Sequence, residues 1–235
     1  ILIDKCRLDG GYVNLFTDEQ GRTNLDIFPP SEPDTVEESS EFTYGIDLAS
    51  LRFNDVNINY SDLTQGMLAD IEGFDMSAKA KMRDDMLAGN IVLSMNSINY
   101  NQTTDSLSML VKLNDLRFEG DAEMIGDDIR ADIEASSSSL NYESNGQYAE
   151  FNNLNFKYDG DVNNYDVVKG NLELSLDDLS FVMDNETYVN KADVRLITPL
   201  DATLSTMNVK LGASQLAFNN ILIDMIGEVA MPTDD

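Results

Sequence analysis

Apolar and polar residues alternate along most of the chain, and the stretch from Ile46 to Met76 shows this pattern most clearly. Apolar side chains recur there at every second residue, as in Ile58-Asn59-Tyr60, and a spacing of two is the period of a β-strand. Some spacings are three, which would turn the following run to the wrong face of a sheet unless a β-bulge absorbs one residue. We therefore predict bulged strands, with the chain bending at Ala49-Ser50 and at Asn54-Asp55.

One short phrase, an apolar residue followed two places later by an aromatic residue, recurs about every 40 residues. A step of three precedes each copy, and a weaker phrase of the same kind follows about a dozen residues later. The five copies are Ile58-Asn59-Tyr60, Ile98-Asn99-Tyr100, Leu140-Asn141-Tyr142, Leu179-Ser180-Phe181 and Leu216-Ala217-Phe218. A near-constant period indicates one supersecondary unit that repeats and stacks on itself.

These patterns predict an all-β chain with little helix, organised as one domain. Residues 1–28 read as an N-terminal β-hairpin with a turn or bulge at Gly10-Gly11, and residues 46–235 form the β-repeat region that continues it. Between them, residues 29–45 form an acidic, Pro- and Ser-rich linker that cannot bury enough apolar surface to offset its ordering entropy.

Within the repeats, we expect tight turns at residues 83–85 and 126–128 and a longer turn at residues 159–166. Pro199 should lie between strands, because proline cannot donate a ladder hydrogen bond.

The charge of the chain excludes several partners. Lys and Arg number 15 against 43 Asp and Glu, for a formal net charge of −28. This balance argues against binding to nucleic acid and against docking on an anionic membrane surface, since both need basic residues. The simplest interpretation is that the acids keep a repetitive sheet soluble and prevent edge-to-edge association.

Candidate chemistry is sparse. The chain has no His, which removes the common nucleophilic triads and most zinc sites, and its one cysteine, Cys6, sits in an apolar alternation typical of a buried small hydrophobe. Asp159-Gly160-Asp161 begins like a calcium loop, but the required glycine and terminal glutamate are missing, so we interpret it as a turn. The acid pairs at residues 84–85, 127–128 and 177–178 have no accompanying base. We expect no catalytic residues, no metal and no cofactor, and hence no enzyme.

The repeated aliphatic and aromatic stripe has two interpretations. A stripe at strand spacing is usually the packed core of a sandwich or barrel. Alternatively, it lines an open, curved sheet whose apolar face holds acyl chains, which adaptable Met side chains, 11 in this chain, would favour slightly. The candidate lipid-facing residues are Ile58, Tyr60, Ile98, Tyr100, Leu140, Tyr142, Leu179, Phe181, Leu216 and Phe218.

Several stretches resemble the AsmA-like family of bacterial envelope proteins. The phrases LASLRFNDVNINYSD (residues 48–62) and IEGFDMSAKAKM (residues 71–82) are similar to its repeats. DEQGRTNLD (residues 18–26) resembles the signature after which a linker enters the family's repeat region. The order of signature, linker and repeats also matches, and the resemblance covers most of the chain.

The resemblance implies an elongated, curved antiparallel sheet of ~40-residue repeats that forms an open groove or taco-like shape. It also implies a periplasmic location, with tethering to the inner membrane by an N-terminal helix that this sequence lacks. Family members are related to bridge-like lipid transfer proteins and are associated with outer-membrane biogenesis and phospholipid transport. Phospholipid or another acyl-chain lipid is the expected partner, and envelope proteins are a second class. The alternative function is a scaffolding β-repeat domain with a closed, dry core that binds protein partners.

Overall fold

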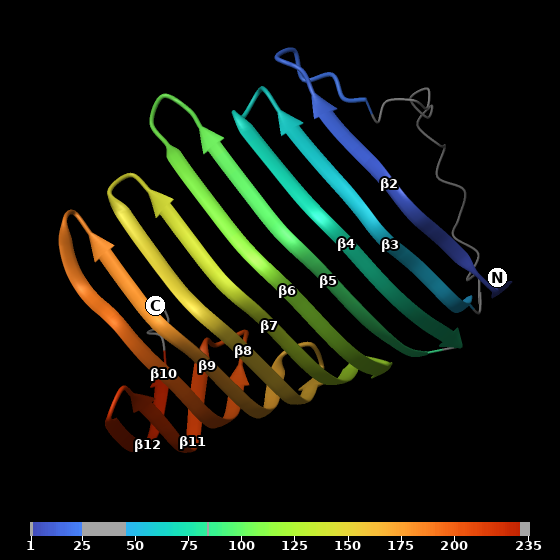
Figure 1. The fold of residues 1–235 in the computed structure, drawn as a ribbon. Helices are drawn as coiled ribbons and strands as arrows, with labels where there is room; N and C mark the ends of the chain where they lie inside the picture. Colours follow the sequence, from blue (N-terminus) through green and yellow to red (C-terminus); the bar gives the residue numbers. More distant parts are fainter. Residues whose placement is uncertain (1, 25–45, 84, 231–235) are drawn as a thin grey trace.

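The computed structural model describes residues 2–24, 46–83 and 85–230. All regular secondary structure in these ranges is β-strand, which confirms the all-β prediction. The strands form one open 12-stranded sheet (Figure 1). The strands are β1 (Leu2–Ile3), β2 (Cys6–Thr17), β3 (Ile46–Asp62), β4 (Met67–Arg83), β5 (Met86–Thr103), β6 (Ser108–Ile125), β7 (Asp128–Ser144), β8 (Gln147–Asn163), β9 (Val167–Met183), β10 (Glu186–Thr203), β11 (Asn208–Phe218) and β12 (Ile221–Ala230).

From β3 to β12 the sheet is a meander in which each strand pairs antiparallel with the next one along the chain. The tight turns predicted at residues 83–85 and 126–128 are confirmed, because β4 ends at Arg83 and β6 at Ile125. The turn predicted at residues 159–166 is shorter than expected, since β8 continues to Asn163. The calcium-like sequence Asp159-Gly160-Asp161 therefore lies in a strand and not in a turn.

The N-terminal prediction is wrong in its pairing. In the described residues 2–24, β1 and β2 do not form a hairpin; both pair in parallel with β3. Gly10 and Gly11 have φ angles of 64° and 137°, so they form an irregularity inside β2 rather than a turn that reverses the chain. The predicted linker at residues 29–45 lies outside the described residues.

The sheet has an apolar face and a polar face. Residues that pair directly across neighbouring strands project on the same side of a sheet. The strand pairing therefore defines a row of residues on the apolar face that crosses eleven strands. This row, from β2 to β12, is Leu8, Phe53, Met76, Leu93, Phe118, Ala135, Phe156, Leu174, Leu196, Leu216 and Ile223. The intervening side chains form the polar face.

The sheet is a single layer, and neither face is covered by other described residues in the manner of a sandwich (Figure 1). Among the described hydrophobic residues, only Val56, Leu176, Ala192 and Ala202 are buried. The apolar stripe is therefore not the core of a closed barrel or sandwich.

Bulges run across the middle of the sheet. Register shifts in β3 between Leu48 and Leu51 and between Phe53 and Val56 confirm the two bends predicted there. Non-glycine residues with positive φ occur near the same level in other strands, including Asp115 at 51° and Asn153 at 50°. Because each bulge bends its strand, aligned bulges bow the whole sheet, as Figure 1 shows.

Hydrogen bonds from polar side chains support these bulges. The Ser138 hydroxyl donates to Asp115 Oδ2 over 2.7 Å, and Asn153 Nδ2 donates to Asp177 Oδ2 over 2.9 Å. In β4, Gly73 has a φ of 60°, and a Cβ atom there would lie 2.2 Å from Asn96 Nδ2. Short polar residues and glycine therefore occupy these positions because the bulges leave backbone groups unpaired and space restricted.

Two single-residue predictions are also wrong. Pro199 lies inside β10, opposite Asn171, and not between strands. A register shift between Ile197 and Leu200 removes the ladder hydrogen bond that proline could not donate, and the proline ring packs against Gly212 of β11. Cys6 is exposed and not buried, because it lies on an edge strand of a sheet with no second layer.

A candidate apolar groove

The register places the predicted lipid-facing residues on the apolar face. The aromatic residues of the first four copies fall in one row, where they alternate with smaller side chains. This tyrosine row consists of Leu15, Tyr60, Ala69, Tyr100, Val111, Tyr142, Ala149, Phe181 and Val189. The aliphatic partners Ile58, Ile98 and Leu140 share the next row, which also contains Val13, Ile71, Leu113 and Phe151.

The fifth copy is displaced from the others. Leu216 pairs with Leu196, and Phe218 pairs with Val194, so both lie several residues below the tyrosine row. Leu179 pairs with Ala192 near the shifts between β9 and β10. The displacement arises because β11 has 11 residues against 18 in β10 and ends opposite Val194. The structure therefore gathers four of the five phrases into one band.

The tyrosine row marks a boundary between apolar and polar surface. The Tyr100 hydroxyl donates to Gln102 Oε1 over 2.9 Å, and the Tyr60 hydroxyl approaches Asp62 Oδ2 at 3.4 Å. Burial, followed by the nearby Asp62 charge, raises the pKa of Tyr60, while hydrogen bonds, first that of the Thr64 hydroxyl, lower the pKa of Asp62. Rings with an apolar body and a polar tip are typical of such a boundary.

A hollow of about 460 Å³ lies on the apolar face, nearer the opposite ends of the strands. Its floor includes a row of small residues, in which each glycine or alanine lies opposite the next across the four strands β4 to β7. The row is Ala80, Gly89, Ala122 and Ala131. Gly160 and Gly170 continue the row in register, but the Tyr158 side chain lies over these two glycines. Large side chains such as Leu87, Phe118 and Ile133 form its walls. Neighbouring strands lie about 4.8 Å apart, so the row is roughly 14 Å long and runs across the strands.

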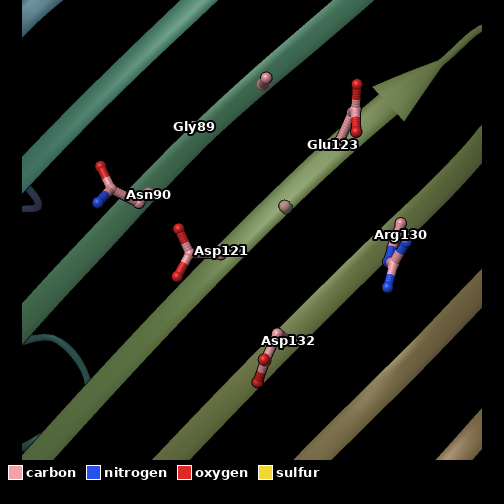
Figure 2. A pocket seen from close by; sticks show the side chains of 8 residues that line it. Gly89, Asn90, Asp121, Glu123, Arg130 and Asp132 are labelled. Atoms are coloured by element: carbon pink, nitrogen blue, oxygen red, sulfur yellow. The ribbon is translucent and has the colours of Figure 1, made fainter.

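The polar face has its own hollow of about 510 Å³ on the opposite side of the same strands (Figure 2). Figure 2 shows Asn90, Asp121 and Asp132 on three neighbouring strands, with Glu123 and Arg130 further along. Gly89 and Ala122 border the hollows on both faces. This hollow is acidic, but no group of His, Cys, Asp or Glu in the described part of the chain is arranged to hold a metal ion.

Charges on the polar face alternate across the sheet. One row reads Asp47, Lys81, Ala88, Glu123, Arg130, Asp161, Lys169, Asp201, Lys210 and Glu228. Ion pairs occur within it at Lys169 Nζ–Asp201 Oδ2, 3.6 Å, and at Lys210 Nζ–Glu228 Oε1, 3.5 Å. Exposed pairs of this kind add little stability. The direct opposition of unlike charges on neighbouring strands favours the observed register.

Sequence reasoning missed the row of small residues and the row of alternating charges. Each strand contributes one glycine or alanine, or one charge, and only the register of neighbouring strands brings these into line. The acidic pair at residues 177–178 also belongs to the bulges: Asn152 Nδ2 donates to Asp178 Oδ2 over 3.1 Å. Both acids therefore accept hydrogen bonds from asparagine side chains on the neighbouring strand β8.

Comparison of the chain with protein-family models, with curated proteins and with solved structures finds no match. No described helix has the length and apolar character needed to cross a membrane.

Proposed function

We propose that this chain is a non-enzymatic module that shelters the acyl chains of lipids on its apolar face. The observation that carries the proposal is the apolar row from Leu8 to Ile223, which crosses eleven strands without a covering layer of described residues. Contiguous apolar surface of this extent is uncommon on a protein that is alone in water and marks an interaction site.

The energetics favour an extended apolar ligand. Each methylene group that leaves water for an apolar surface contributes about 0.8 kcal/mol. A hollow that runs across the strands lets a single acyl chain contact the four strands β4 to β7 in succession. The row of small residues gives such a chain a path between the taller Leu87 and Ile133 side chains.

The resemblance to AsmA-like repeats supports a location for this activity. On that basis the proposed setting is the periplasm of a bacterial envelope, on an inner-membrane-tethered protein that contributes to phospholipid transport and outer-membrane biogenesis. The bowed, open sheet is consistent with the groove that the resemblance implies (Figure 1).

A scaffolding role is the second proposal, and the edge strand β12 favours it. Ile221, Leu222, Ile223 and Ile226 are exposed by 60%, 63%, 44% and 81%, and they project from both faces of this strand. An edge strand that is apolar on both sides suits the addition of a strand from a protein partner. The closed, dry core expected for such a scaffold does not occur, because the sheet is open.

Native mass spectrometry of the purified protein, followed by solvent extraction and lipid analysis, tests the lipid proposal. We expect phospholipid to copurify, or to bind when vesicles are supplied. A protein that stays bare in excess phospholipid would contradict the proposal and favour the scaffold.

A double variant tests the face itself. Tyr100→Asp with Leu140→Asp places two charges on the apolar face, in adjacent rows. Because neither residue is in a closed core, we expect the variant to retain its β-sheet circular dichroism and to lose lipid. Retention of lipid by the folded variant would show that this face is not the binding surface.

A further inference from the structure

Acids strongly outnumber bases at both rims of the apolar face. The upper rim comprises the turns beyond the tyrosine row, and the lower rim comprises the turns at the opposite ends of the strands. Described acids on the upper rim are Asp18, Glu19, Asp62, Asp105, Asp184 and Glu186, and the described basic residue there, Arg22, is paired with Asp18. Described acids on the lower rim are Asp85, Asp127, Asp128 and Asp166, accompanied by Arg83. A polar group held at either rim would therefore lie in a negative potential.

The floor between the rims offers no positive charge to compensate. Every described lysine or arginine with a strand partner projects from the polar face, including Lys112, Arg117 and Arg195. On the apolar face, the charged residues with a strand partner are Asp62 and Glu186, both at strand ends. An anionic head group would accordingly meet mainly carboxylates and tyrosine hydroxyls, since Arg22 is already paired with Asp18 and Arg83 projects from the polar face.

We propose that the groove selects lipids whose head group carries an ammonium ion, such as phosphoethanolamine lipids, over lipids with a net negative head group. The inference rests on the proposed lipid function and adds its specificity. The acyl chain occupies the apolar floor and the head group lies at a rim. There an ammonium group is attracted by the carboxylates, and by the faces of the tyrosine row where it comes within about 6 Å of a ring centroid. A head group with a net negative charge meets repulsion instead.

Salt separates this electrostatic selection from selection by shape. The screening length is about 30 Å at 0.01 M salt and about 3 Å at 1 M, so the rims act strongly on a head group only in the first condition. Contacts of the acyl chains with the floor are insensitive to this change by comparison. The preference should therefore be large at low salt and small at high salt.

The protein is incubated with vesicles that contain equimolar dioleoyl phosphatidylethanolamine and dioleoyl phosphatidylglycerol. It is then separated from the vesicles, and both bound lipids are quantified. We expect the ethanolamine lipid to be enriched about fivefold in 10 mM salt and to approach the vesicle ratio in 1 M salt. Capture of both lipids in the vesicle ratio at low salt, or enrichment of the glycerol lipid, would overturn the inference. Capture of neither lipid would instead contradict the proposed function.

A matched pair of variants locates the effect. Asp105→Lys with Asp184→Lys reverses two exposed charges on the upper rim, and we expect it to reduce the enrichment to less than twofold. Asp121→Lys with Asp159→Lys makes the same change in net charge on the polar face and should leave the enrichment unchanged. An equal loss of enrichment in both variants would show that net charge, and not the rims, makes the selection.

Discussion

The substitution Ala122→Asp should block the hollow without unfolding the sheet. Ala122 lies on β6 in the row of small residues, between Gly89 and Ala131, and it is exposed. Since no second layer packs on it, a larger side chain at this position meets open space. A carboxylate there interrupts the apolar path across the strands.

The size of the effect follows from the groups that the carboxylate displaces. If the acyl chain avoids the charge and its bound water, about three methylene groups lose their contact with the floor. At ~0.8 kcal/mol each, the loss is about 2.4 kcal/mol. A tenfold change in affinity corresponds to about 1.4 kcal/mol, so binding should weaken roughly 50-fold.

The assay is a titration of wild type and variant with a phosphatidylethanolamine that carries a fluorophore on one acyl chain. Ala88→Asp is the matched control, because Ala88 lies on neighbouring β5 but projects from the polar face, between Lys81 and Glu123. Both variants introduce the same poor strand former, and their unfolding midpoints in urea should be similar. Equal affinities for the two variants would refute the assignment of the hollow to the acyl chain.

Three further predictions concern the sheet itself. Gly73→Ala should destabilise the protein by about 2 kcal/mol in urea unfolding, since φ is 60° and the new methyl group meets Asn96; adding Asn96→Ala should restore part of the loss. Ser214→Ala should lower the free energy of unfolding by about 1–3 kcal/mol, because Ser214 and Thr198 are 1% and 2% exposed and their hydroxyls lie 2.6 Å apart. The double variant with Thr198→Val should lose less stability than the sum of the two single variants, and full additivity would argue against coupling. The pKa of Tyr60 is raised in the folded protein, so its contribution to stability is present below about pH 10 and is lost as pH rises through the folded pKa. Bound phospholipid should raise this pKa further by removing water from the phenol group. An ultraviolet titration, with Tyr60→Phe as the reference, measures the shift, and the absence of a shift would contradict binding at the tyrosine row.

The alternation of side chains predicted much of the fold because it is a local signal. Strand period, the bends in β3 and the tight turns after β4 and β6 all depend on residues close together in the chain. The same signal could not reveal that β2 pairs in parallel with β3, because an edge strand alternates in the same way beside either partner. Nor could it place Pro199 inside β10, because the irregularity that accommodates the ring lies in the pairing with β11.

The candidate site was predictable only in part. The repeated phrase led to Tyr60, Tyr100 and Tyr142, which the register brings into one row. The row of the sheet in which Phe218 lies depends on the register between β10 and β11, and the periodicity of one sequence does not define that register. The hollow depends on a row of four small residues on four strands, and each of them alone looks like an ordinary alanine or glycine.

The meander also determines how the molecule can fold. Each strand from β3 onward makes its main contacts with the strand before it and the strand after it, so a hairpin can form as soon as its two strands are available. Stability then builds up in steps along the chain, and opening should begin at the edges while β5 to β8 retain their amide protons longest. The pairing of β2 with β3 is different, because the chain must close a loop between Thr17 and Ile46 before these strands can meet. A protein with this connectivity can extend its sheet one hairpin at a time as the chain emerges, without waiting for a distant segment to complete a core.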